Sequence, residues 1–152
     1  MMVFFAVIYS CLGRGKVVDD VLSCKSNINM DFSDGESKGP LINGVLYINL
    51  NGYGDGFLDV SGVITVQSNT YPVYKRIMIT HDFNRSHRVG IVVIRTVSSL
   101  SLENDLSPQG MIEKLLIGDE SLSSNVFSFK KIFDNGYLIG NLYLPAMICI
   151  NI

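Results

Sequence analysis

Hydrophobic and polar residues alternate along most of the chain after Cys24. The alternation is clearest in residues 46–50 and 58–67, and it continues through 73–79 and into 89–102, a stretch rich in β-branched residues. Successive side chains of a β-strand point to opposite faces of the sheet. The pattern therefore predicts a series of β-strands, each with one buried and one solvated face.

Short polar segments separate these strands. Residues 33–40 form a polar loop with Gly and Pro, residues 51–56 contain three glycines, and Asn-Gly at 135–136 lies between two apolar runs. Asn-Gly between apolar runs is a strong hairpin signal, and glycines supply the positive φ angles of tight turns. We also expect a turn at 84–86. Consecutive strands should therefore be joined as antiparallel hairpins.

One segment departs from the alternation and predicts a helix. Ser107 is a candidate N-cap, Pro108 suits the first helical position, and Gly118 can end the helix. Apolar residues recur between them at helical spacing, at Met111, Ile112, Leu115 and Leu116. We expect one short helix in a protein that otherwise consists of strands.

The C-terminal part predicts strands at 126–133 and 136–144, with 147–152 as a short edge segment after Pro145. In total the sequence predicts seven or eight antiparallel strands and one helix. This is a mainly β fold, either a strongly curved antiparallel sheet or a small barrel that is closed or incomplete.

The first twelve residues carry no charge, and Arg14 and Lys16 follow them. A helix that spans a bilayer needs about 20 apolar residues, so this run is short for a complete span. It suits a membrane anchor that lacks its upstream part, a degenerate signal peptide, or a buried first strand or helix. We assign 1–16 as an anchor or signal-like segment and 17–152 as one β-rich domain.

Composition narrows the functional class. The 152 residues are 47% hydrophobic and 17% charged, with a net charge of −2. The hydrophobic content excludes a disordered chain, and the acidic balance argues against a nucleic-acid-binding domain. A chain of this length forms one domain.

The three cysteines leave two interpretations open. Cys24 and Cys149 lie near the two ends of the β-rich domain, while Cys11 lies in the apolar run. The outer pair suits either a disulfide that ties the ends together or two buried free thiols. An apolar leader favours the oxidising alternative. No cysteine or histidine spacing typical of zinc is present in the sequence.

Residues that could carry catalysis are few. His81, Asp82 and His87 bracket an expected turn, where they form either a metal or hydrolase site or an ordinary exposed group. We predict no catalytic residue, metal or cofactor. The basic residues Lys75, Arg76, Arg85, Arg88 and Arg95 form either a contact patch for an anionic ligand or an acidic partner, or a solvated hairpin edge.

Aromatic residues on several strands could line an apolar cavity that binds an amphipathic ligand. The residues that we expect to face a ligand or partner are Tyr47, Tyr71, Tyr74, Arg76, Phe127 and Phe129.

A resemblance to a known family rests on Cys24 and on four segments, residues 44–50, 60–64, 135–140 and 145–149. Over roughly 24–149 the chain resembles the FidL-like proteins of enteric bacteria, and more distantly the periplasmic co-components ToxS and VtrC. The short apolar leader departs from the family pattern, which has a full membrane anchor.

The resemblance implies a single-pass protein of the inner membrane with a periplasmic β-rich domain and a Cys24–Cys149 disulfide. It implies a non-enzymatic accessory protein that binds and stabilises the sensory domain of a membrane-bound winged-helix transcription regulator as a heterodimer. The two domains would share a lipocalin-like barrel that binds a bile-salt-like ligand. The alternatives are a self-sufficient periplasmic carrier and an enzyme that uses the two histidines.

Overall fold

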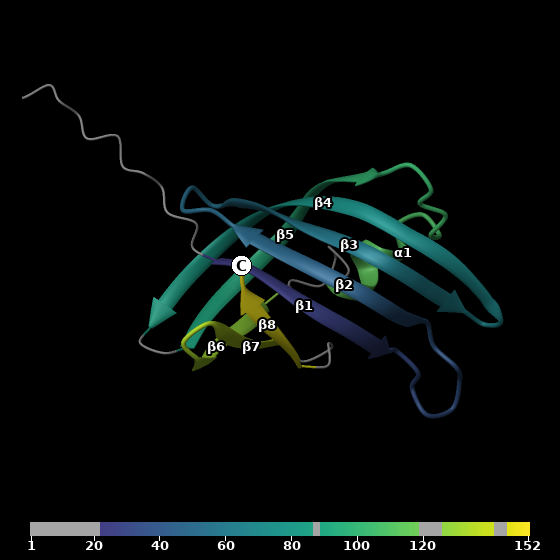
Figure 1. Cartoon of the computed structure of the whole chain (residues 1–152), viewed down its shortest axis with the longest axis horizontal. Coiled ribbons are helices and arrows are strands. Elements are labelled where there is room, and N and C mark those ends of the chain that lie inside the picture. Colours follow the sequence, from purple (N-terminus) through teal and green to yellow (C-terminus); the bar gives the residue numbers. More distant parts are fainter. Residues whose placement is uncertain (1–21, 87–88, 119–125, 142–145) are drawn as a thin grey trace, which may run out of the picture.

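The structure, a computed structural model, describes residues 22–86, 89–118, 126–141 and 146–152. The segment 1–16, assigned above as an anchor or signal-like segment, and His87 lie outside the described residues. The elements, shown in Figure 1, are β1 (Leu22–Asp31), β2 (Leu41–Leu50), β3 (Asp55–Val66), β4 (Asn69–Ser86), β5 (Val89–Ser101), α1 (Met111–Leu116), β6 (Val126–Phe133), β7 (Gly136–Gly140) and β8 (Met147–Asn151).

The eight strands form a closed antiparallel barrel in which each strand pairs with the next along the chain and β8 pairs with β1. This up-and-down order is that of lipocalin-like barrels, and it confirms the predicted mainly β fold. The expected edge segment at 147–152 is wrong, because β8 pairs with β7 on one side and with β1 on the other.

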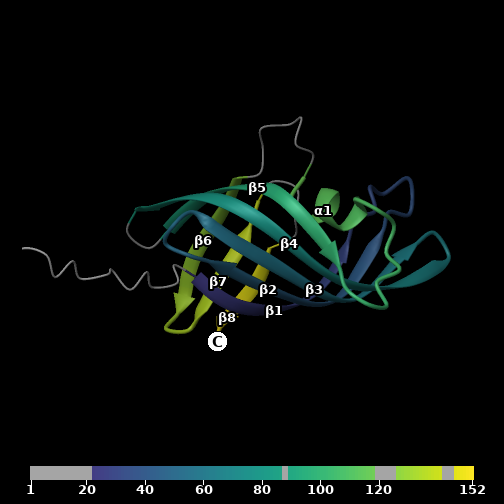
Figure 2. The same ribbon diagram turned by 90° about the horizontal axis from the view of Figure 1, so that it is seen from above.

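The barrel is uneven along its length. Strands β1 to β5 have 10 to 18 residues each, whereas β6 to β8 have 5 to 8. Figure 2 shows the three short strands gathered towards one end, with the long strands extending past them. We call this the N-terminal end of the barrel: β1 begins here, the β2–β3 and β6–β7 turns lie here, and the chain ends here at Ile152.

The alternating residues fill the barrel interior as predicted. Leu46, Ile48 and Leu50 of β2 are buried, and so are Leu58, Val60 and Ile64 of β3. A Gly44–Gly62 pair lies between these strands, and a Cβ atom on Gly44 would lie 2.2 Å from the Ser61 carbonyl oxygen. The two glycines therefore allow β2 and β3 to approach closely at this position.

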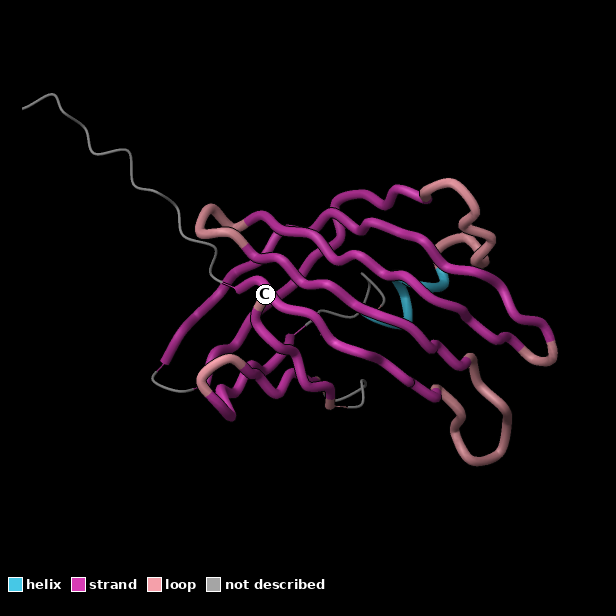
Figure 3. The backbone as a smooth tube through the Cα atoms, viewed as in Figure 1, coloured by secondary structure: helices cyan, strands magenta, loops and turns pink. Residues whose placement is uncertain are grey.

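Two turns differ from the sequence prediction. Residues 84–86 belong to β4, which continues to Ser86, so they do not form the expected turn. The polar loop at 33–40 and the glycine-rich turn after Leu50 are found where predicted (Figure 3). Strand β7 ends at Gly140, short of the predicted 144, and 142–145 lie outside the described residues.

Helix α1 begins later than predicted, at Met111, with Gly110 as its N-cap at φ +72°. The Ser107 hydroxyl donates a hydrogen bond of 2.8 Å back to Asp105, so Ser107 does not cap the helix. Ile112 and Leu116 of the helix, with Ile117 at its C-cap, are buried in the same core as the strands. The helix thus fills part of the barrel interior.

A β-bulge in β5 changes which residues face inwards. The register with β4 shifts between Met78 and Ile79, which pair with Ser98 and Thr96 and leave Val97 unpaired. Before the bulge, Val92 and Ile94 are buried, whereas beyond it the Ser99 hydroxyl reaches Glu113 of α1. A bulge inserts one extra residue and so exchanges the two faces of a strand.

Candidate functional site: the groove between β1 and β8

The seam between β1 and β8 is the least complete part of the barrel wall. On its other edge, β1 pairs with β2 over all ten residues. Towards β8, within the described residues, it pairs at Cys24 with Asn151 and at Lys25 with Ile150. The Ile152 amide adds a hydrogen bond of 3.3 Å to the Ser23 carbonyl. Beyond Lys25, the described residues of the two strands are no longer paired.

A groove of about 610 Å³ lies where the strands separate. Its β1 wall is mostly polar outside and apolar inside, because Asn27 and Asn29 point outwards whereas Ile28 and Met30 are buried. Its β8 wall is apolar on both faces, with Met147 buried and Ile148 exposed. The lining residues are Lys25, Asn27, Ile28, Asn29, Met30, Ala146, Met147, Ile148, Ile150 and Ile152.

The backbone of the groove offers hydrogen-bonding groups. Within the described part of the chain, β1 from Ser26 to Asp31 has no strand partner on the side of β8. An unpaired strand edge presents alternating N–H and C=O groups that can accept another strand. The groove therefore combines an apolar floor with a free strand edge.

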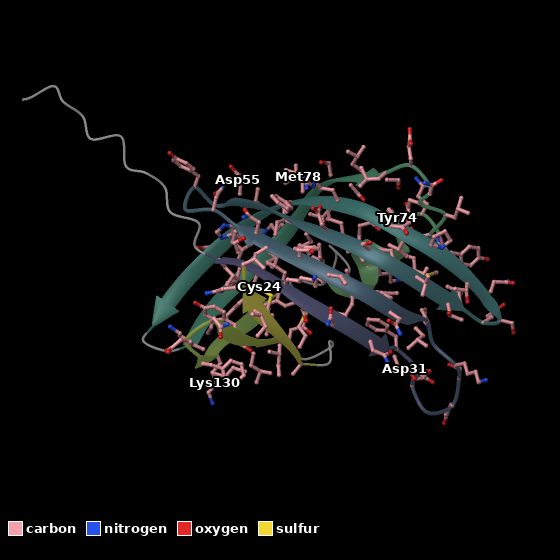
Figure 4. All side chains as sticks on the ribbon, viewed as in Figure 1. Cys24, Asp31, Asp55, Tyr74, Met78 and Lys130 are labelled. Carbon is pink, nitrogen blue, oxygen red and sulfur yellow. A yellow bond between two sulfur atoms is a disulfide. The ribbon has the colours of Figure 1, made fainter. Side chains whose placement is uncertain are left out.

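The disulfide between Cys24 and Cys149 closes the seam next to the groove. Their Cα atoms are 5.5 Å apart and both side chains are fully buried. Figure 4 labels Cys24 on β1, next to β8. This pairing confirms the disulfide that the family resemblance implied.

A buried ion pair fixes α1 inside the barrel. The Lys75 ammonium lies 3.1 Å from Oε1 of Glu113, and the two side chains are 5% and 15% exposed. Burial acts to raise the pKa of Glu113, but hydrogen bonds from the Ser99 hydroxyl and the Lys75 ammonium outweigh it and lower that pKa. The pair therefore links β4, β5 and α1, and the lowered pKa keeps the Glu113 carboxylate ionised at neutral pH.

Lys75 and Arg76, two of the five basic residues of the contact-patch alternative, lie on opposite faces of β4 and so do not share a patch. Arg76 points outwards, where it donates two hydrogen bonds to Asp59, at 2.7 and 2.6 Å, and its guanidinium lies 4.3 Å from the centre of the Phe57 ring. The hydrogen bond to Asp59 raises the pKa of Arg76. The side chains of Arg85 and Arg88 lie outside the described residues.

Of the three residues in the histidine-based alternative, the structure describes His81 and Asp82. Nε2 of His81 lies 2.8 Å from the Asn51 carbonyl oxygen, and the His81 amide donates to Gly54, so this residue holds the β2–β3 turn. Asp82 follows it in β4 and thus points to the opposite face. No group of three His, Cys, Asp or Glu side chains in the described part of the chain could hold a metal ion.

The six residues expected to face a ligand or partner divide between the two faces. Phe127 and Phe129 are buried inside the barrel and Tyr71 packs against the same core, whereas Tyr74 and Arg76 are exposed. The Tyr47 ring lies on the outer face, 5.5 Å from the Lys25 ammonium of the groove. None of the six lines the groove. Their role in binding stays a prediction.

The sequence did not reveal the groove, because the residues that line it have the pattern of two ordinary strands. The incomplete pairing of these strands is not visible in the sequence. Among the described residues, no helix is both long and apolar enough to span a bilayer. None of the protein-family models, curated proteins or solved structures compared with this chain matches it.

Proposed function

We propose that this chain is a non-enzymatic accessory protein whose barrel binds the sensory domain of a membrane-bound winged-helix transcription regulator. The observation that carries the proposal is the groove between β1 and β8, with its unpaired strand edge. A strand of the partner would add to β1 between Ser26 and Asp31, where main-chain hydrogen bonds supply affinity. Its inward side chains would cover Ile28, Met30 and Met147.

The disulfide supports a periplasmic location for the barrel. Disulfides persist in oxidising compartments such as the bacterial periplasm and are rare in the cytosol. The Cys24–Cys149 bond is fully buried and joins two strands of the barrel wall. Together with the apolar run at 1–12, it supports a protein anchored in the inner membrane with its barrel on the periplasmic side.

A ligand would lie in the barrel that the partner completes. Ile112, Leu116 and Ile117 at α1 occupy the interior of the described barrel. This packing counts against the alternative of a self-sufficient carrier. We propose a bile-salt-like amphipath that binds the assembled heterodimer better than the separate chains, because only such a difference can shift the assembly equilibrium. Cholate should therefore raise the Tm of the complex more than that of the chain alone.

Co-expression tests the proposal directly. The full chain and the periplasmic domain of a winged-helix regulator encoded beside it should co-purify, and Ile148→Asp should abolish this. Ile91→Asp is the matched control, because Ile91 is 52% exposed, Ile148 is 50% exposed, and Ile91 lies on β5, away from the groove. Failure of the wild-type chain to co-purify, or equal loss with both variants, would contradict the proposal.

A further inference from the structure

The N-terminal end of the barrel presents exposed apolar side chains on three separate segments. Tyr53 in the β2–β3 turn is 76% exposed, Phe133 at the β6–β7 turn is 51% exposed, and the C-terminal Ile152 is 73% exposed. Figure 1 shows both turns at the end where the chain enters β1. Turn tips are usually polar or glycine-rich, so large apolar side chains at this end suggest a contact surface.

The Tyr53 turn is held firmly. The Asn51 side-chain oxygen accepts hydrogen bonds from the amides of Tyr53 and Asp55, at 2.9 and 3.1 Å. His81 binds the same turn through its amide, 2.7 Å from the Gly54 carbonyl oxygen, and through its ring. Since the backbone is fixed, the Tyr53 side chain is directed outwards at little further cost in conformational entropy.

The β6–β7 turn is likewise joined to the C-terminal strand. The Asn151 amide donates a hydrogen bond of 2.8 Å to the Asn135 carbonyl. The Phe133 ring lies over Gly136, where a Cβ atom would be only 2.2 Å from the ring. Phe133 and Ile152 therefore belong to one connected part of the barrel end.

The length of chain before β1 limits how far this end can lie from a membrane. Nine residues, 13–21, separate the apolar run at 1–12 from β1. Fully extended, nine residues span at most about 32 Å. If the run is embedded in a bilayer, as the proposed function holds, the N-terminal end is the part of the barrel nearest to the lipid.

We propose that the N-terminal end of the barrel rests on the lipid surface, with Tyr53, Phe133 and Ile152 entering the headgroup region. Tyrosine suits this position because its ring is apolar and its hydroxyl remains hydrated. The exposed charged residues nearby have both signs: Asp55 and Asp134 are acidic, and Lys130 and Lys131 are basic. We therefore attribute the contact to apolar burial, not to attraction by anionic lipids.

This placement orients the binding groove. The groove starts beside the N-terminal end, where Lys25 and Ile152 line it, and extends away from that end along β1 to Met30. Contact between that end and the bilayer would hold the far part of the groove off the membrane, on the side where the sensory domain of a membrane-bound partner extends. The inference rests on the membrane anchoring in the proposed function, but not on the identity of the partner.

The chain contains no tryptophan, so one introduced tryptophan is a unique reporter. We would reconstitute the full chain into phosphatidylcholine vesicles, with lipids brominated on their acyl chains as quenchers. Three variants are compared: Tyr53→Trp, Phe133→Trp and the control Tyr74→Trp. Tyr74 is also exposed and lies towards the opposite end of the barrel (Figure 4). Each change replaces one exposed aromatic ring with another, so the fold should be retained.

We expect quenching of Tyr53→Trp and Phe133→Trp to exceed that of Tyr74→Trp by about two-fold or more, and to persist at high salt. Equal quenching at the three positions, or none, would overturn the inference. A shift in tryptophan emission that requires the regulator's periplasmic domain instead of lipid would also overturn the inference, since this end of the barrel would then contact protein. Co-purification tests the proposed function separately: partner binding without quenching would refute only the lipid contact.

Discussion

Cys24 and Cys149 are joined by a disulfide at the point where β1 and β8 separate. On one side of this bond, two residue pairs and a terminal hydrogen bond complete the barrel wall. On the other side the wall opens into the groove. The disulfide therefore keeps the seam closed at the N-terminal end while a strand edge stays open for a partner.

Loss of the disulfide should destabilise the barrel strongly. Its two cysteines are 125 residues apart, and closing a loop of this length contributes about 5 kcal/mol in the chain-entropy model. Urea unfolding of Cys24→Ser/Cys149→Ser should show a lower midpoint than the wild type. Reductant should lower the wild-type midpoint to that of the variant and leave the variant unchanged. An unchanged midpoint in the variant would show that the bond contributes little to stability.

The Lys75–Glu113 pair should make stability depend on acid pH. Because the pKa of Glu113 is lowered in the folded state, its contribution is complete above the ordinary value of 4.5 and is lost as the pH falls below it. Urea unfolding of Glu113→Gln should show a weaker dependence on pH in this acid range. A dependence identical to that of the wild type would mean that other carboxylates account for it.

At neutral pH, Glu113→Gln should cost about 2–3 kcal/mol, because it leaves the Lys75 ammonium buried without a counter-charge. This is below the usual cost for a fully buried pair, since Glu113 keeps some exposure. The double variant Lys75→Met/Glu113→Leu should recover much of the loss, because it removes both charges. Equal stability of Glu113→Gln and the wild type would contradict a structural role for the pair.

The Gly44–Gly62 contact predicts a position-specific effect of adding one methyl group. Gly44→Ala places a Cβ atom against the Ser61 carbonyl and must push β2 away from β3, which should lower the Tm by several degrees. Gly140→Ala is the control, because its Cβ atom would meet Ala146 at an ordinary distance of 3.5 Å. Similar Tm values for the two variants would show that β2 and β3 need no close approach here.

Local sequence patterns predicted the positions of the strands better than they predicted the closure of these strands into a barrel. Alternation located the buried faces of β2 and β3, and the glycines after Leu50 marked the turn between them. The role of 147–152 was missed, because a strand that closes a barrel and a strand at a sheet edge have similar sequences. Closure depends on the partner of β8, which lies more than 120 residues earlier in the chain.

The candidate site, too, could be predicted only in part from local sequence patterns. The Cys24–Cys149 pair was expected, and it lies beside the groove, but the groove itself arises from incomplete pairing that no local pattern encodes. The bulge at Val97 exchanges the faces of β5, so its inward residues could not be assigned from alternation alone. Neighbours in sequence such as Lys75 and Arg76 likewise separate onto opposite faces.

Hydrogen exchange on the full chain, with and without the regulator's periplasmic domain, tests the central claim most directly. We predict that amides of β1 between Ser26 and Asp31 gain protection in the complex, because the partner strand pairs with this edge. Amides of β3, which are paired on both sides by β2 and β4, should stay unchanged. A complex that leaves exchange in β1 unaltered and protects another part of the barrel would contradict the claim.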